Sequence, residues 1–433
     1  MLKKSKILLL TIILAGCNNQ MNKKAPLIPM EDFFRNPDKS SFQISPDGQH
    51  IAYMKPWKTR MNVHVINVET TDETRLTSSE DRGIYGYGWL GNNRIGYAKD
   101  DDGDENIHFF AVNIDGTNEI DLTPFENVQT RMIDDLEDDP DHIILGLNKR
   151  DPRIHDAFRV NVTDGTMKLI AENPGNISGW MTDHEGNLRV AITSDGVNTS
   201  LLYRDSESES FKTILTTDFK VRVDPLFFTF DNKNLYVASN RNRDKSAIYT
   251  FDITETQEKE LIFENDQVDV SGLMYSKKRK VLTGVSYTVA KREIFFFDDW
   301  RKDIQNKLER KFPGYEVGIT SFSKDEKNAV VVTYSDKSRG TYYSYDVEKN
   351  ELNELAKISP WLNEDHMAEM KPITYTSRDG LTIPGYLTLP VGSGGKNLPF
   401  VVHPHGGPWA RDSWGYNSEV QFLANRGYAI FQM

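Results

Sequence analysis

The sequence has almost no cysteine: of its 433 residues only Cys17 carries a thiol. A disulfide framework and a thiolate metal cluster are therefore both excluded within this chain. Basic residues are also in deficit, because 52 Lys and Arg stand against 64 Asp and Glu and the net charge is −12. Most of such a surface would repel a phosphate backbone, so we expect no nucleic-acid partner.

The composition places the chain among folded proteins. It is 38% hydrophobic and 27% charged, which is too apolar for a disordered chain and too polar for a protein that crosses a membrane many times. The length allows two or three domains. Without disulfides, their stability must come from packing.

The first residues have the pattern of an export signal. Three lysines precede an apolar run over 7–14, which is too short to span a bilayer as a helix. The run ends in Leu-Ala-Gly-Cys at Cys17, which is typical of a bacterial lipobox. We expect 1–16 to be removed as a lipoprotein signal peptide; an ordinary secretory signal with a coincidental cysteine is the alternative.

Lipidation of Cys17 would anchor the mature chain in a membrane. Several acyl chains, each worth ~0.8 kcal/mol per buried methylene, anchor a protein stably. Asn18 lacks the carboxylate of an inner-membrane retention signal. We therefore expect a lipid-anchored protein of the cell envelope, on the outer membrane or facing the periplasm, with 17–40 as its anchor and N-terminal segment.

A pattern of turn and strand returns seven times over 41–358. Each copy opens with a polar turn, and the first apolar residues after the turns lie 44, 48, 45, 47, 46 and 48 residues apart: Ile51, Ile95, Ile143, Leu188, Leu235, Val281 and Ala329. A period in the mid-forties with four short strands per unit is typical of a β-propeller. We predict a mainly β protein with a seven-bladed β-propeller, since separate β-sandwiches would need units about twice as long.

No metal or cofactor site is expected within the repeats. The charge cluster over 100–106 is not an EF-hand loop, which needs Gly at the sixth and Glu at the twelfth position, because Glu105 and Ala111 stand there. A solvated turn is the better interpretation. Five histidines also lack the spacing of metal ligands: His108, His142, His155, His184 and His366.

Clear helix signals are few. The best covers 361–370, just past the last repeat, and predicts a linker helix within 359–371. Beyond it the chain changes character, because 372–433 contain four basic and three acidic residues. The acidity therefore belongs to the repeats.

The segment 372–433 has the pattern of an α/β domain that is incomplete. A hairpin is predicted around the turn at 378–380. The apolar run 398–402 predicts a strand buried on both faces. A helix is predicted over 418–426, with Val420, Phe422 and Leu423 inward and Gly427 ending it, and a second buried strand follows it to the C-terminal residue.

Between the predicted strand and helix lies His403-Pro404-His405-Gly406-Gly407. This order of elements is how an α/β-hydrolase builds its oxyanion loop. Glycine is needed there because a backbone N–H must approach the developing alkoxide closely, and one such donor is worth roughly 2.7 to 4 kcal/mol. A plain turn is the alternative.

Taken together, Cys17, the repeats and His405-Gly406-Gly407-Pro408 resemble the prolyl oligopeptidase family of serine peptidases, in its acylaminoacyl-peptidase and dipeptidyl-peptidase-like branch. The resemblance covers 25–433, and its most specific parts are 28–37, 44–48, 103–106 and 377–408. It implies that a propeller caps the hydrolase domain and restricts access to short peptides. It also implies that Gly407 donates its N–H to the oxyanion, with Gly406 and His405 as supporting residues of the loop.

The sequence departs from this family in its catalytic triad. No G-x-S-x-G occurs, and the glycine-rich stretch around Ser393 has the wrong spacing. His403 and His405 precede the expected nucleophile, so neither can be the base, which comes last in the order Ser, Asp, His. We expect the nucleophile, acid and base to be absent and the chain to be an N-terminal portion, inactive alone, of a longer peptidase.

Two functions are therefore open. The first is a serine-type exopeptidase or oligopeptidase of the bacterial cell envelope that acts on short peptides. The absence of a Trp-x-Tyr-Glu-Glu segment argues against, without excluding, a post-proline dipeptidase of that family. The alternative is a propeller lipoprotein without catalysis that binds peptides or a partner protein. The sequence leaves the oligomeric state open.

Overall fold

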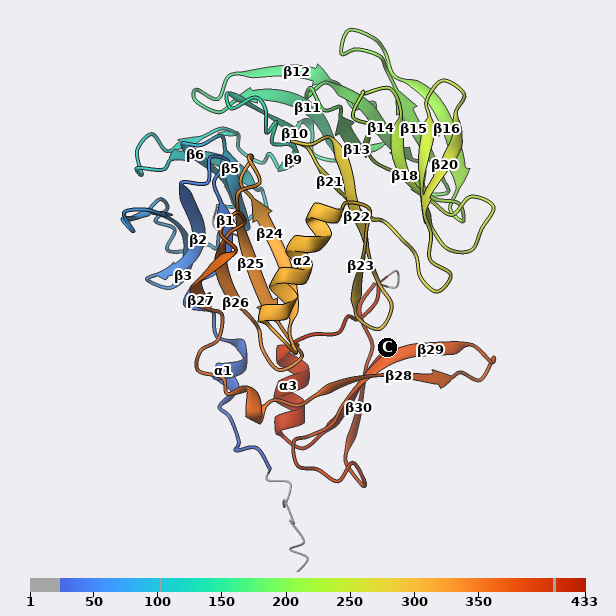
Figure 1. Ribbon diagram of the computed structural model, residues 1–433. Helices are drawn as coiled ribbons and strands as arrows, with labels where there is room; N and C mark the ends of the chain where they lie inside the picture. Colours follow the sequence, from blue (N-terminus) through green and yellow to red (C-terminus); the bar gives the residue numbers. More distant parts are fainter. Residues whose placement is uncertain (1–23, 102, 408–409) are drawn as a thin grey trace, which may run out of the picture.

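The computed structural model describes residues 24–101, 103–407 and 410–433, so the predicted signal peptide and Cys17 lie outside the described residues. From Ser40 to Lys357 the described chain forms seven antiparallel sheets of consecutive strands. Six have four strands and the sixth in chain order has three. The sheets follow one another in a propeller-like arrangement, with the C-terminal part below them in Figure 1.

The strand boundaries of the first four sheets are β1 (Ser40–Ile44), β2 (His50–Trp57), β3 (Arg60–Asn67), β4 (Glu73–Arg75), β5 (Gly86–Leu90), β6 (Arg94–Lys99), β7 (His108–Asn113), β8 (Ile120–Asp121), β9 (Thr130–Asp134), β10 (His142–Asp151), β11 (Ile154–Asn161), β12 (Met167–Ala171), β13 (Ile177–Thr182), β14 (Leu188–Ser194), β15 (Asn198–Tyr203) and β16 (Lys212–Asp218).

The strands of the other three are β17 (Val223–Phe228), β18 (Leu235–Ser239), β19 (Ala247–Asp252), β20 (Gln257–Phe263), β21 (Gly272–Ser276), β22 (Val281–Thr288), β23 (Arg292–Phe296), β24 (Glu316–Phe322), β25 (Asn328–Tyr334), β26 (Thr341–Asp346) and β27 (Glu351–Lys357). All seven repeat markers lie on the second strand of a sheet. Six of them are buried, and the exception is Val281 of the three-stranded sheet, which is 37% exposed.

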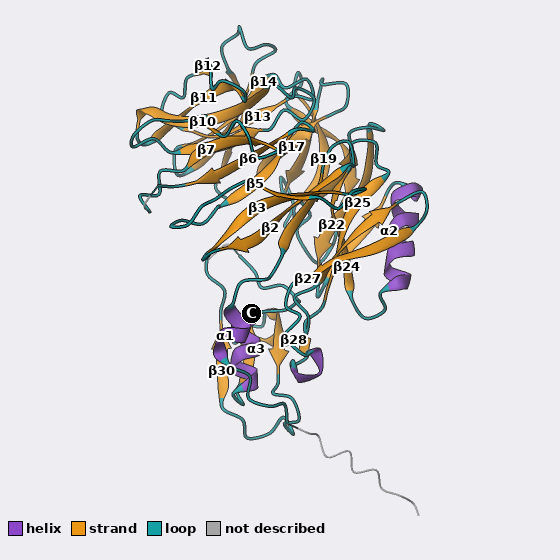
Figure 2. Cartoon of the chain, turned by 90° about the vertical axis from the view of Figure 1, so that its left-hand side faces the viewer, coloured by secondary structure: helices purple, strands orange, loops and turns teal. Residues whose placement is uncertain are grey.

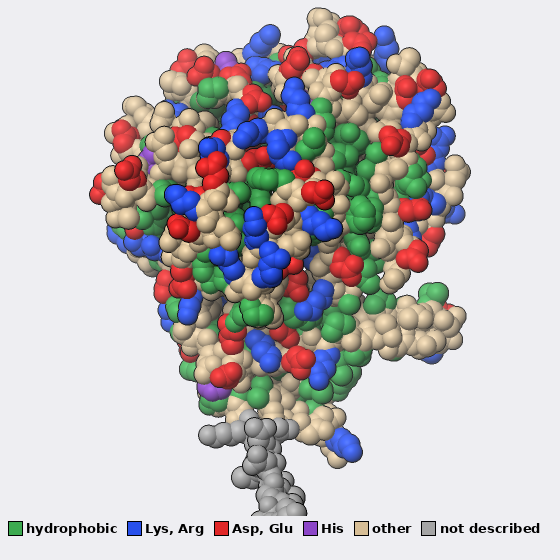
Figure 3. All heavy atoms as spheres, in the orientation of Figure 1, with side chains coloured by type: hydrophobic (Ala, Val, Ile, Leu, Met, Phe, Trp, Pro, Cys, Tyr) green, Lys and Arg blue, Asp and Glu red, His purple; other side chains and the backbone are tan. Residues whose placement is uncertain are grey.

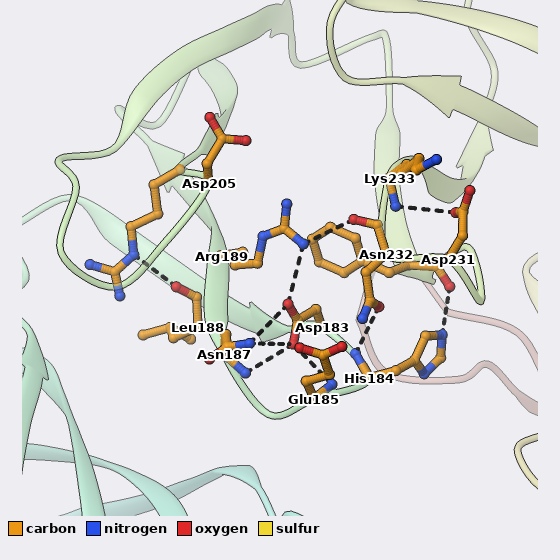
Figure 4. A network of polar contacts seen from close by, with 12 residues as sticks. Asp183, His184, Glu185, Asn187, Leu188, Arg189, Asp205, Asp231, Asn232 and Lys233 are labelled. Carbon is orange, nitrogen blue, oxygen red and sulfur yellow. Dashed lines mark hydrogen bonds and ion pairs between the residues drawn. The ribbon is translucent and has the colours of Figure 1, made fainter.

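The repeated polar turns connect neighbouring sheets as well as neighbouring strands. Figure 4 shows one of them, where the carboxylate of Asp183 accepts bonds from its own turn and from Nη1 of Arg189 at 3.2 Å. The same Nη1 donates to the carbonyl of Asn232 on the corresponding turn of the next sheet. This turn therefore orders itself and also contacts the corresponding turn of the next sheet.

The sheets pack face to face around a closed ring. Hydrophobic clusters lie between each successive pair from the first sheet to the sixth. The first sheet also packs on the seventh, through Phe42 and Tyr53 against Val330. The N–H of Lys324 donates to the carbonyl of Pro46 there, so the two ends of the repeat array are joined.

Helix α2 (Asp299–Lys311) follows β23, the last strand of the three-stranded sheet, and packs on the seventh sheet. Asp298 caps it by accepting from the N–H of Arg301 at 2.9 Å, and Ile304 and Leu308 pack on the strands of the seventh sheet. The sequence did not predict this helix because only one narrow apolar stripe marks it. The predicted helix over 361–370 is wrong: the chain there makes one 3-10 turn, Glu364–His366, because Asn363 caps only that turn and β28 begins at Met370.

The C-terminal region is a four-stranded sheet with one helix. It contains β28 (Met370–Thr376), β29 (Thr382–Thr388), β30 (Phe400–His403), α3 (Ser418–Asn425) and β31 (Ala429–Gln432), in the sheet order β28-β29-β31-β30. The pair β30 and β31 is parallel and the others are antiparallel. The hairpin of β28 and β29, the helix and the last strand agree with the predictions. Figures 1 and 3 show this hairpin projecting sideways from the body of the molecule.

The prediction that 398–402 is buried on both faces is wrong. Strand β30 lies at the edge of the sheet, with Phe400 57% exposed and Val402 49% exposed. Helix α3 packs over β31 instead, where Val420 and Ala424 contact Ile430. The apolar sequence predicted burial, but among the described residues β30 pairs only with β31, so its other edge is left open.

The N-terminal segment is fastened to the C-terminal region. Helix α1 (Met30–Phe34) places Phe33 and Phe34 against Phe422 of α3, with ring centroids 5.9 and 5.7 Å apart. Phe422 thus faces this helix rather than the sheet. Figure 2 shows α1 beside α3, away from the seven sheets. Among the described residues no helix is long and apolar enough to cross a membrane.

Candidate functional site

The predicted oxyanion loop leaves the sheet at the end of β30 and returns to regular structure at α3. Because β30 and β31 are adjacent parallel strands joined through α3, the loop lies at the carboxyl edge of the sheet. This edge is where open α/β sheets bind ligands. The structure therefore places the Gly406-Gly407 pair in the strand-to-helix position that was predicted.

The backbone of the glycine pair requires glycine at one position. Gly407 has φ = 141°, a conformation that side chains with a Cβ rarely adopt. Gly406 is exposed, and a Cβ added to it would meet no described heavy atom within 4 Å. The position that a side chain of residue 406 would occupy is thus open, whereas residue 407 is held in a conformation that favours glycine.

The two histidines of the loop have different surroundings. His405 donates from Nδ1 to the carbonyl of Gly406 at 2.8 Å, a bond that stiffens the loop at the glycine pair. His403 is the last residue of β30, and its Nε2 lies 3.3 Å from Oε2 of Glu419 at the start of α3. His405 thus contacts the glycine pair, and His403 links the end of β30 to the start of α3.

A large cavity opens beside this loop, between the fifth and sixth sheets and the β28-β29 hairpin. Its volume is about 1100 Å³, enough for a small peptide. The charged groups of its wall are Lys245, Asp269, Arg411 and Asp412, and Tyr287 and Tyr386 also line it. Arg411 and Asp412 follow the glycine pair closely in sequence, so the loop forms part of the cavity wall.

The segment 410–416 contains functional candidates that the sequence analysis missed. Arg411 donates to two carbonyls of the sixth sheet, and Trp414 donates from Nε1 to the carbonyl of Met370 at 2.9 Å. Burial raises the pKa of Tyr416 to about 12. The available signal was composition: a Trp, a Tyr, an Arg and an Asp within seven residues are more than a solvated turn needs.

Buried polar atoms lie next to Arg411. Asp412 accepts from Nε2 of Gln432 at 3.0 Å through one oxygen, while its other oxygen and Oε1 of Gln432 have no partner among the described residues. Gln432 is only 1% exposed. Such atoms are costly when unpaired, so this end of β31 is a position where further polar partners are expected.

A second depression lies at the far ends of β9, β13, β17 and β21. It has a volume of about 300 Å³ and mixes acidic residues with Arg159, Lys277 and His184. The ring of His184 stacks on Phe230 and its Nε2 donates to the carbonyl of Phe228 at 2.8 Å. This histidine is therefore structural. Among the described residues no group of His, Cys, Asp and Glu could hold a metal ion.

Other candidates from the sequence fall outside a site. Ser393 lies in the loop between β29 and β30, where its N–H donates to the carbonyl of Pro390. In the charge cluster over 100–106, Asp100 is buried and paired with Arg82 through two bonds of 3.0 and 2.8 Å. The predicted solvated turn thus holds for the exposed part of the cluster and not for Asp100.

Comparisons with known proteins agree with this geometry. No family model matches the chain. Dipeptidyl aminopeptidase BIII of Pseudoxanthomonas mexicana is 30% identical over 425 residues, which cover 94% of this chain and 60% of that protein. Dipeptidyl peptidase family member 6 of Caenorhabditis elegans is 23% identical over 449 residues, again 94% of this chain and 60% of the relative. The chain thus spans about 60% of the length of these two relatives.

A solved structure shows the same fold. The structure of prolyl oligopeptidase B from Galerina marginata, in complex with a 35mer substrate, aligns with a TM-score of 0.68 and 12% identity. The alignment covers 92% of this chain and 62% of that one. It includes both the seven sheets and the C-terminal region.

Proposed function

Because the chain belongs to the prolyl oligopeptidase family of peptidases, we propose that it forms the propeller and the oxyanion loop of a serine-type exopeptidase or oligopeptidase. One observation carries the proposal. The loop with Gly407 lies between adjacent parallel strands at the carboxyl edge of the sheet, and its continuation lines the cavity of about 1100 Å³. A peptide bound in that cavity would lie against Arg411 and Asp412, a few residues after Gly407 in the same loop.

In this proposal the N–H of Gly407 stabilises the oxyanion, and Gly406 and His405 shape the loop. The serine nucleophile, its base and its acid are assigned to the part of the whole protein outside these 433 residues, because no G-x-S-x-G turn occurs in the sequence. The family's second oxyanion donor is the N–H after that serine. The 433 residues alone are therefore expected to show no turnover.

The finer architecture is part of the proposal. The seven sheets are taken as the blades of a seven-bladed propeller, and 372–433 as the start of an α/β-hydrolase domain. The seven consecutive sheets, the packing of the first on the seventh, and the β30-α3-β31 unit support it. In this arrangement the propeller caps the cavity and restricts substrates to short peptides.

The proposed reaction is the release of short units from the amino terminus of a peptide. The two relatives described above carry dipeptidyl aminopeptidase and dipeptidyl peptidase names. Such a substrate brings an ammonium group into the cavity, and Asp269 is an exposed carboxylate on its wall. Asp269→Asn is expected to raise the KM for peptides with a free amino terminus and to leave amino-blocked peptides unaffected; an equal effect on both would remove Asp269 from this role.

We propose further that the protein is anchored in the cell envelope through lipid on Cys17. The sequence pattern that ends at Cys17 supports this. Cys17→Ser should release the protein from the membrane fraction, and membrane association that persists in this variant would refute the anchor.

The decisive experiment uses the whole protein. The gene is sequenced past the codon for Met433, and the protein that the whole reading frame encodes is expressed. This protein is then treated with a fluorophosphonate probe and with dipeptidyl p-nitroanilides. Labelling of the whole protein together with release of p-nitroaniline is expected, and the 433-residue chain should remain unlabelled. A whole protein that neither labels nor cleaves would overturn the proposal.

The alternative is a propeller lipoprotein that binds peptides without cleaving them. It predicts a saturable peptide titration by a whole protein that does not react with the probe. The depression at the far ends of β9, β13, β17 and β21 is the surface such a protein would use. Peptide binding that is weakened by substitutions in that depression, and not by substitutions in the loop, would favour this alternative.

A further inference from the structure

One turn of the sixth sheet is held by the C-terminal region through three successive carbonyls. Arg411 donates from Nη1 to the carbonyl of Thr288 at 2.7 Å and from Nη2 to the carbonyl of Val289 at 2.8 Å. The hydroxyl of Tyr386 donates to the carbonyl of Ala290 at 2.7 Å. The turn between β22 and β23 is thus a docking point for the region that contains the glycine pair.

The next residue of the turn adds a fourth contact. Nζ of Lys291 lies 3.4 Å from the ring centroid of Trp414 and 3.1 Å from Oε1 of Glu316 on β24. A cation over the face of an aromatic ring is attracted by the negative charge of that face. The turn therefore contacts the loop on both sides of residues 412–413.

The loop needs this support because it has no regular structure of its own. From Pro404 to Tyr416 it contains neither helix nor strand among its described residues. Its ends are fixed by β30 and by the cap of α3, where Asn417 accepts from the N–H groups of Glu419 and Val420. Between these ends the described residues contact the sixth sheet through Arg411, whose hydrogen bond to Thr288 spans 123 residues of sequence.

The contact suits arginine in particular. A guanidinium is planar and presents its N–H groups in a fixed fork, so one side chain can satisfy two adjacent carbonyls with little loss of entropy. A lysine at this position would present a single point charge and could not hold both in one geometry. The two bonds therefore fix the orientation of the Arg411 guanidinium on the β22-β23 turn as well as its distance from that turn.

We propose that Arg411 is a positioning residue for the oxyanion loop, and that the β22-β23 turn is the support against which it holds the Gly407 N–H in place. This inference rests on the proposed function, because it assigns the loop an oxyanion to bind. In this proposal Arg411 acts through the backbone of the loop and not by contact with a reacting atom. An oxyanion donor acts only when it is preorganised, and a displacement of about 1 Å can cost on the order of a hundredfold in rate.

The structure of the sixth sheet makes the support of the loop by Arg411 sensitive to how the C-terminal region packs against the seven sheets. It has three strands where the others have four, so its last turn has less support from its own sheet. If the C-terminal region moves away from this turn, Arg411 loses both partners at once. Activity would then depend on contact between the seven sheets and the hydrolase part.

The first test measures backbone hydrogen exchange in the 433-residue chain. Arg411→Ala is expected to speed the exchange of amides over 404–412 about tenfold or more, while peptides from β2 and β10 keep their protection and report an intact fold. Arg411→Lys gives the same readout if the alanine variant does not fold. Unchanged exchange over 404–412 in both variants would overturn the proposal.

The matched control is Arg426→Ala. Arg426 also joins distant segments, since its Nη2 donates to the carbonyl of Ile28 at 2.8 Å, but it lies beyond α3 and does not contact the loop. Its loss should leave exchange over 404–412 unchanged. An equal effect of both substitutions would mean that Arg411 acts only through general stability, which would also overturn the proposal.

The second test uses the whole peptidase. Arg411→Ala should lower kcat roughly 10- to 100-fold with little change in KM, and Arg411→Lys should recover part of the loss. A rise in KM at constant kcat would make Arg411 a substrate-binding residue instead. If the wild-type protein cleaves nothing, the proposed function fails, whereas the exchange experiment still decides whether Arg411 holds the loop.

Discussion

Nζ of Lys277, on the turn after β21, lies 3.0 Å from the Oδ2 carboxylate oxygen of Asp138, on the turn after β9. These residues belong to the sixth and third sheets, which are not neighbours in the ring. Asp138 also pairs with Lys324 of the seventh sheet. The acidic turn after β9 thus ties together three sheets at the end of the ring opposite the C-terminal region.

This pair should contribute little to stability and should depend on salt. All three side chains are a third to a half exposed, and exposed pairs are typically worth about 0.2 to 1 kcal/mol. A double-mutant cycle with Asp138→Asn and Lys277→Gln, measured by urea unfolding, should give a coupling free energy in that range, and the coupling should shrink in 1 M salt. A coupling that is independent of salt would contradict this account.

The same carboxylate gives a pH dependence of known sign. Its hydrogen bond from Lys324, followed by that from Lys277, holds the pKa of Asp138 below its ordinary value of 3.8. The stabilisation is therefore complete above pH 3.8 and is lost as the pH falls through the lower pKa of the folded state. In Asp138→Asn the free energy of unfolding should fall less steeply below that pH than in the wild type.

His155 should make the protein less stable in mild acid. Burial, and secondarily the nearby Arg131, lower the pKa of His155 from 6.5 to about 4, although Asp156 acts in the opposite direction. The unfolded chain takes up a proton near pH 6.5 and the folded chain only near 4. The free energy of unfolding should thus be constant above pH 6.5 and fall between 6.5 and 4.

Denaturant unfolding at pH 7.5 and 4.5 tests this prediction. His155→Gln should reduce the difference in unfolding free energy between the two pH values. His366→Gln, in the 3-10 turn outside the sheets, serves as the control and should leave the difference unchanged. An identical pH dependence in wild type and His155→Gln would show that another group is responsible.

Under the proposed function, in which Gly407 donates to the oxyanion, Gly407→Ala should impair the reaction more than the fold. With φ = 141°, the backbone must change conformation to accept a Cβ, which turns the N–H away from the oxyanion. In the whole peptidase kcat should fall roughly 10²- to 10³-fold, the loss expected for one oxyanion donor. Gly427→Ala is the matched control, since Gly427 has φ = 93° at the end of α3 and should reduce thermal stability with little effect on kcat.

We expect the 433-residue chain to self-associate through the exposed edge strand β30. Exposed apolar edge strands are templates for pairing with other chains, and Val402 is one of the exposed residues of β30. Val402→Lys should reduce the aggregated fraction in analytical ultracentrifugation. Leu381→Lys adds the same charge at an exposed position between β28 and β29 and should leave the aggregated fraction unchanged. An equal effect of both substitutions would mean that net charge, and not the edge of the sheet, controls the association.

The sequence determined the repeats because their signal is local and recurs. A polar turn followed by a short apolar run specifies a hairpin wherever it occurs, so the seven markers from Ile51 to Ala329 located the second strand of every sheet. The strand, the glycine pair and the helix from Phe400 to Asn425 were also marked locally, by an apolar run, by Gly406-Gly407 and by an amphipathic pattern with a cap.

Only the tertiary structure decided what joins these parts. The helix at Asp299–Lys311 is stabilised because Ile304 and Leu308 pack against the seventh sheet. The predicted burial of Phe400 was wrong because burial depends on neighbours that are far away in sequence. Arg411 is the strongest case. Its two bonds to Thr288 and Val289 cross more than a hundred residues, and no local pattern can indicate a partner that folding alone brings within reach.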